Sequence, residues 1–81
     1  MKIKDKVTFN LQSYELTSYW DTPFGVVYLY TFKDFFNNTF IWKTSRFIEN
    51  NIERVSGTIK NFVEYNGQKE IELYYCKTYT V

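Results

Sequence analysis

The stretch FGVVYLYTFKDFFNNTFIWKTS, residues 24–45, decides the fold of this chain. Two runs within it, residues 26–32 and 39–44, are rich in β-branched and aromatic side chains. Such side chains suit a pleated, half-buried strand. Between the runs, Asn37-Asn38 tolerate the backbone angles of a tight reversal. We therefore predict a β-hairpin with its turn at these two asparagines, around which the rest of the chain wraps.

The two faces of this hairpin differ in character, because successive side chains of a strand point to opposite sides. One face is entirely aromatic and is the predicted core side, with Tyr28, Tyr30, Phe32, Phe40 and Trp42. The other is the predicted open face, with Thr31, Lys33, Lys43 and Ser45 beside the aliphatic Leu29 and Ile41. The hairpin thus supplies both a wall of the core and a candidate binding surface.

The segment before the hairpin alternates apolar and polar residues from Val7 to Leu11, as a half-buried strand does. The apolar set then moves to the other parity at Tyr14 and Leu16. This phase slip predicts a bulge in one long strand that serves two sides of a small barrel. We interpret residues 18–23 as the connection from this strand to the hairpin.

The segment after the hairpin contains two more strands. Residues 53–65 form the fourth, with Gly57 as a candidate bend or bulge. Asn66-Gly67 is the strongest hairpin-turn signal in the chain and predicts a type I′ turn. Residues 70–76 form the fifth strand. Its predicted core set is Ile71, Leu73 and Tyr75.

Between the third and fourth strands, Ser45 is placed to cap a short helical turn with Ile48 and Ile52 on one side. Five strands with such a turn in this position are the order expected of an OB-fold, a five-stranded Greek-key barrel. We therefore predict an all-β, OB-fold-like barrel, with an SH3-like barrel as the alternative. The 81 residues, 1–81, have room for a single domain.

Composition excludes several classes of function. The chain has no His, a single Cys and only three scattered Gly residues. It therefore lacks the commonest general base and metal ligand, a cysteine zinc site and a phosphate-binding loop. Glu70 and Glu72 share one parity, and we interpret them as a solvated strand face rather than a catalytic pair. We expect no enzyme activity, no cofactor and no metal, and we expect Cys76 to be a core thiol.

The sequence gives weaker indications of the protein's location and partners. The single Cys cannot form an internal disulfide, and the charged start at residues 1–6 lacks the apolar segment of a signal peptide. No run approaches the length of a membrane span. We therefore expect a cytoplasmic protein. Its net charge of +1 does not mark a basic nucleic-acid binder in bulk, although a local patch is compatible with it.

Most of the chain, residues 24–77, resembles a group of small OB-like domains from phage and mobile-element proteins of Gram-positive bacteria. The resemblance rests on the following motifs: Phe24-Gly25, Tyr28-Leu29-Tyr30 with Asp34, Phe40-Ile41-Trp42, Gly57-Thr58-Ile59-Lys60 and Tyr65-Asn66-Gly67-Gln68-Lys69. It implies a non-catalytic domain that binds single-stranded nucleic acid during replication or recombination of such an element.

Two functions therefore stay open. OB-folds present their second and third strands and two loops to oligonucleotides, which require cations and exposed aromatic rings. The nucleic-acid-binding residues expected here are Trp20, Thr31, Lys33, Lys43, Arg46 and Lys69. The alternative is a protein-interaction module, because aromatic residues are enriched at interfaces and the net charge is small. An edge strand could then pair with a partner or with a second copy, so we expect a monomer or a weak homodimer.

Overall fold

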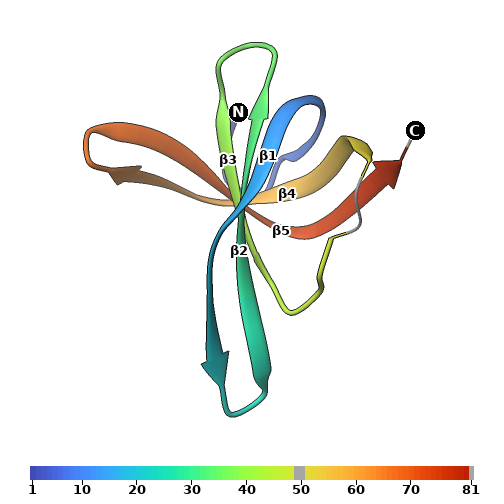
Figure 1. Ribbon diagram of the computed structural model, residues 1–81. Coiled ribbons are helices and arrows are strands. Elements are labelled where there is room, and N and C mark those ends of the chain that lie inside the picture. Colours follow the sequence, from blue (N-terminus) through green and yellow to red (C-terminus); the bar gives the residue numbers. More distant parts are fainter. Residues whose placement is uncertain (49–50, 81) are drawn as a thin grey trace.

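A computed structural model describes residues 1–48 and 51–80, and these residues form an all-β, closed, five-stranded barrel (Figure 1). The strands are β1 (Lys6–Thr22), β2 (Gly25–Asp34), β3 (Thr39–Thr44), β4 (Ile52–Tyr65) and β5 (Gln68–Thr80). Their order around the barrel is β1-β2-β3-β5-β4. All neighbours are antiparallel except β3 and β5, which run parallel over residues 40–42. This is the order of an OB-fold-like barrel, so the predicted fold class is confirmed.

The long first strand serves two neighbours, as its phase slip predicts. Residues 6–10 of β1 pair with β4, and residues 11–22 pair with β2. The β1–β2 register shifts between Leu11 and Ser13 and again between Leu16 and Ser18. Each shift inserts an extra residue and increases the bend of the strand. The bulges let β1 leave β4 and continue with β2 as a hairpin that extends beyond the barrel (Figure 1).

The connection expected over residues 18–23 is wrong, because β1 continues to Thr22. Thr22 pairs with Gly25, so the turn itself is only Pro23 and Phe24. The Thr22 hydroxyl donates to the Gly25 carbonyl at 2.7 Å and accepts from the Phe24 amide at 3.2 Å. Gly25 has a φ of +119°, which favours glycine. These contacts close a tight turn and extend the strand pairing to the hairpin tip.

The aromatic face of the β2–β3 hairpin is the core, as predicted. Tyr30, Phe32, Phe40 and Trp42 are buried, and Tyr28 is half-buried at the edge. Phe9 of β1 stacks on Phe40 with ring centroids 4.0 Å apart. The opposite wall of the core consists of aliphatic side chains from β4 and β5, namely Val55, Ile59, Ile71 and Leu73.

The two predicted turns are both confirmed. Asn37 has a φ of +67° between β2 and β3, and the buried Asp34 carboxyl group accepts hydrogen bonds from the amides of Phe36 and Asn38. Between β4 and β5, Asn66 and Gly67 have φ values of +52° and +80°. Positive φ at both central residues is the requirement of a type I′ turn.

The predicted core set of the fifth strand is wrong at one position. Ile71 and Leu73 are buried, but Tyr75 is 80% exposed and Cys76 is buried in its place. Tyr75 has a φ of +54°, and two residues of β5, Tyr75 and Cys76, lie opposite Gly57 alone in β4. This bulge reverses the inside–outside alternation after Tyr74, which a period of two cannot predict. Gly57, the candidate bend or bulge of the fourth strand, thus lies opposite a bulge whose extra residue belongs to β5. The interpretation of Cys76 as a core thiol is confirmed.

The short helical turn expected between the third and fourth strands is not seen in the described part of this connection, residues 45–48 and 51; Glu49 and Asn50 lie outside the described residues. The Thr44 hydroxyl accepts the Arg46 amide at 3.1 Å, and the buried Ile48 amide donates to the Tyr30 hydroxyl at 3.0 Å. These contacts favour a bent, extended course over a helical turn capped by Ser45.

Candidate binding groove

A groove of about 590 Å³ lies on the outer face of β2 and β3, between the β1–β2 hairpin and the β4–β5 hairpin. Strand pairing places its floor in three rows that cross the sheet. The central row is Glu15, Thr31, Ile41 and Glu72, from β1, β2, β3 and β5 in turn. The rows beside it are Ser13, Lys33 and Thr39 on one side, and Ser18, Leu29 and Lys43 on the other. The open face predicted for the hairpin is therefore the floor of a groove.

Apolar and hydroxyl side chains occupy the middle of this floor. Leu29 and Ile41 lie side by side across β2 and β3, and Ile41 is buried. The hydroxyls of Thr17 and Thr31 lie 2.5 Å apart and join β1 to β2. Val63 and Tyr65 of β4 line the opposite wall. The groove thus offers an apolar strip about one strand pair wide, with polar groups along both sides.

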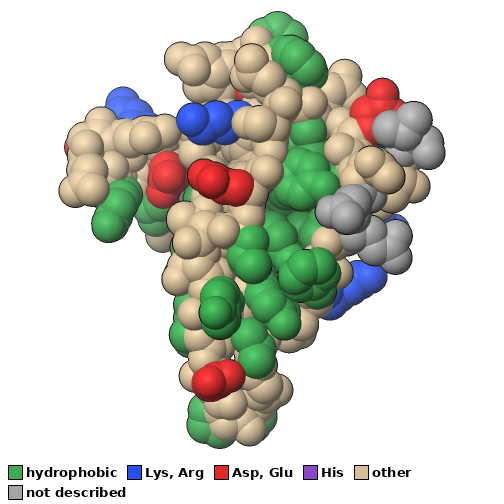
Figure 2. Space-filling view, in the orientation of Figure 1, with side chains coloured by type: hydrophobic (Ala, Val, Ile, Leu, Met, Phe, Trp, Pro, Cys, Tyr) green, Lys and Arg blue, Asp and Glu red, His purple; other side chains and the backbone are tan. Residues whose placement is uncertain are grey.

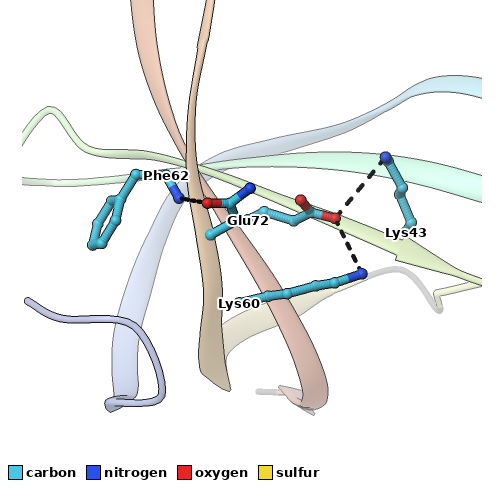
Figure 3. A network of polar contacts seen from close by, with 5 residues as sticks. Lys43, Lys60, Phe62 and Glu72 are labelled. Carbon is cyan, nitrogen blue, oxygen red and sulfur yellow. Dashed lines mark hydrogen bonds and ion pairs between the residues drawn. The ribbon is translucent and has the colours of Figure 1, made fainter.

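Charges of both signs surround the apolar strip. Glu72 is buried, and its carboxylate lies between Lys43 at 3.9 Å and Lys60 at 3.8 Å (Figure 3). The interpretation of Glu70 and Glu72 as a solvated face is therefore wrong for Glu72, which lies in the middle of the sheet with β3 on one side and β4 on the other. Glu15 and Glu70 also line the groove. Lys43 and Lys60 thus share one carboxylate oxygen of Glu72.

The structure brings together three of the six residues expected to bind nucleic acid. Thr31, Lys33 and Lys43 line the groove. Trp20 is 39% exposed and pairs with Val27, so it shares the groove face of the β1–β2 hairpin but lies closer to the hairpin tip. Trp20 is in a strand and does not close the barrel.

The other two expected residues lie outside the groove. Lys69 is near the tip of the β4–β5 hairpin and, with Lys33, lines a separate polar depression beside the β2–β3 turn. Arg46 follows β3 and lines a third depression with Phe47 and Tyr79. Sequence reasoning missed Glu15, Val63 and Tyr65, although the alternation of β4 places Val63 and Tyr65 on one face of that strand.

The single thiol is removed from this groove and from solvent. Burial raises the pKa of Cys76 from 9.0 to about 12, because the thiolate is poorly solvated inside the barrel. Cys76 therefore stays protonated across the physiological range. The parts of the chain that the structure describes hold no group of three or more His, Cys, Asp or Glu side chains placed to bind a metal ion. Nor do they include a helix that is long and apolar enough to cross a membrane.

The fold and groove together define the class of this protein as a small OB-fold-like barrel with a groove on its second and third strands. No protein-family model, curated protein or solved structure matches this chain.

Proposed function

We propose that this protein is a non-catalytic binding module whose groove holds an extended segment of a partner protein. One observation carries the proposal: the central row of the groove floor begins and ends with a carboxylate, at Glu15 and Glu72. A nucleic-acid backbone requires a cationic groove. Here Lys43 already contacts Glu72, which it shares with Lys60.

The apolar strip supports the same conclusion. Leu29, Ile41, Val63 and Tyr65 can receive aliphatic or aromatic side chains of an extended peptide. An extended segment presents alternate side chains to the same side, so its apolar side chains could pack on this strip while the others face the polar groups beside it. The buried thiol of Cys76 fits a reducing compartment such as the cytoplasm, where we place the protein.

The experiment selects extended peptides from a display library with the purified protein and maps their binding by amide chemical shifts. Shifts should concentrate at Leu29, Thr31 and Ile41. Thr31→Arg, at the centre of the floor, should abolish binding, whereas Thr8→Arg makes the same change on an exposed site of β1 outside the groove and should not. The proposal would be contradicted if the selected peptides shifted the amide signals of residues outside the groove. It would also be contradicted if they bound the Thr31→Arg variant as well as the wild type.

Single-stranded nucleic acid remains the second candidate, and the exposed indole of Trp20 favours it. This ring lies on the groove face of its hairpin, where a base could stack at about 1–3 kcal/mol. On this hypothesis the protein serves the DNA metabolism of a phage or mobile element. Titration with short oligonucleotides should then quench the fluorescence of Trp20. The binding should weaken as the salt concentration rises, and it should weaken in the Lys33→Ala variant. Absence of quenching at low salt would exclude this candidate.

A further inference from the structure

The opposite face of the β1–β2 hairpin carries an exposed aromatic patch formed by Leu16, Tyr19, Val26, Tyr28 and Phe47. Tyr19 pairs with Tyr28 across the hairpin, and the Phe47 ring meets the Tyr28 ring edge-on, with centroids 5.7 Å apart. Tyr19 is 68% exposed and Phe47 is 71% exposed. Figure 2 shows a continuous hydrophobic area that runs from the middle of the molecule onto this hairpin.

This patch is the continuation of the core face beyond the barrel. Alternation along β2 places Val26 and Tyr28 on the same side as the buried Tyr30 and Phe32. Among the described strands, residues 20–27 of the hairpin pair only with each other, so the patch extends beyond the barrel toward the hairpin tip. Contiguous exposed apolar surface of this kind marks an interaction site.

Opposite charges stand at two margins of the aromatic patch. Asp21 pairs with Val26, so it lies on the patch face beside the hairpin tip. Arg46 immediately precedes Phe47 and follows Thr44, which pairs with Tyr28, so it lies on the β3 side of the patch. Within the described residues, neither charged group forms an ion pair. Figure 2 shows an acidic side chain near the hairpin tip and basic side chains at the opposite margin of the hydrophobic area.

We propose that this aromatic patch binds a second copy of the same chain, in a two-fold symmetric dimer. A two-fold interface places the same patch on both subunits, so a residue at one margin meets the residue at the other margin. The aromatic rings of Tyr19, Tyr28 and Phe47 then pack against the same rings of the second copy. Asp21 of each subunit meets Arg46 of the other.

The charge arrangement is what selects a second copy as the occupant. A patch with one sign of charge throughout would repel itself, whereas this patch has a negative margin and a positive margin and so complements its own rotated copy. The groove is on the opposite face of the hairpin and stays open. The dimer would therefore present two grooves, so this inference adds to the proposed function and does not depend on it.

Sedimentation equilibrium of the full chain tests the dimer, at concentrations from about ten micromolar to about one millimolar. The wild type should show a monomer–dimer equilibrium. Asp21→Arg and Arg46→Asp should each raise the dimer dissociation constant about tenfold or more, because each creates two like-charge contacts by symmetry. The double variant Asp21→Arg/Arg46→Asp should restore dimerisation, since the two charges exchange places.

Lys33→Glu is the matched control, because it reverses one exposed charge on the groove face and should leave the dissociation constant unchanged. Tyr19→Arg and Phe47→Arg should both give monomers, and circular dichroism verifies that every variant is folded. A wild type that is monomeric at all concentrations would overturn the proposal. It would also be overturned if neither single charge reversal raised the dimer dissociation constant, or if the double variant failed to restore dimerisation.

Discussion

Of the three glycines, Gly57 is the one at which an added methyl group would meet close neighbours. A Cβ atom there would lie 2.8 Å from the Cys76 Sγ and 3.4 Å from a Leu73 methyl carbon. Gly57→Ala should therefore lower the free energy of unfolding by about 1–3 kcal/mol, measured by urea denaturation. Cys76→Ala removes the sulfur. The double variant Gly57→Ala/Cys76→Ala should therefore lose much less unfolding free energy than the sum of the losses of the two single variants. Additive losses would show that the contact is not the cause.

Cys76 itself should be chemically inert while the protein is folded. Its pKa of about 12 leaves almost no thiolate at pH 8, so a disulfide reagent should react slowly in buffer and rapidly in guanidinium chloride. Equal rates in both solutions would contradict the burial of this thiol.

The same shift in pKa makes stability depend on pH. The pKa of Cys76 is about 12 in the folded protein and 9.0 in the unfolded chain. Protonated Cys76 therefore contributes its full share of the unfolding free energy below pH 9, and this contribution is lost as the pH rises toward 12. Comparison of the unfolding free energies of wild type and Cys76→Ala between pH 8 and pH 11, a range of about three units, should show a steeper decline for the wild type. Parallel declines would show that other groups account for the pH dependence.

At the scale of elements, the β2–β3 turn depends on Asp34. Its buried carboxyl group accepts from the Phe36 amide at 3.0 Å, the Asn38 amide at 2.8 Å and the Asn38 side-chain amide at 2.9 Å. Asp34→Ala leaves these donors without their acceptor and should reduce the unfolding free energy by about 2 kcal/mol or more.

Asp34→Asn is the matched variant for this turn. It keeps one acceptor oxygen for the two backbone amides. Its unfolding free energy, measured by thermal or urea denaturation, should therefore fall less than that of Asp34→Ala. If the two variants lose the same stability, the backbone contacts are not what holds the turn.

At the scale of the whole molecule, stability should fall from the barrel toward the hairpin tips. The barrel core contains Phe32, Val55 and Ile59, which are fully buried, whereas the β1–β2 hairpin tip pairs only with itself. Native-state hydrogen exchange should therefore protect amides of residues 30–32 and 40–42 most, and, among strand residues, those of 19–22 and 25–27 least. The measurement uses Arg46→Asp at low concentration, so that dimer contacts do not protect the hairpin. Equal protection of tip and barrel would contradict this ranking.

Local pattern was sufficient to predict the aromatic core face, the turns at Asn37 and Asn66-Gly67, and the bulged first strand, because each depends on residues close in sequence. It also placed Thr31, Lys33 and Lys43 on one open face. It was wrong for Tyr75 and for the connection over residues 18–23. The bulge in β5 changes which side chains point inward after Tyr74, and the turn closed by the Thr22 hydroxyl lengthens β1. Neither feature alters the composition of its strand.

By itself, the sequence of this protein determined five strands, their turns and an all-β barrel, since alternation and turn chemistry act over a few residues. Only the tertiary structure decided which charges meet. The parallel pairing of β3 with β5 buries Glu72 between Lys43 and Lys60, and it places Val63 and Tyr65 opposite Leu29 and Ile41. Lys60 and Glu72 belong to one hairpin, but the other contacts join residues about thirty apart in the chain. Their long-range register follows from closure of the barrel as a whole rather than from any local pattern.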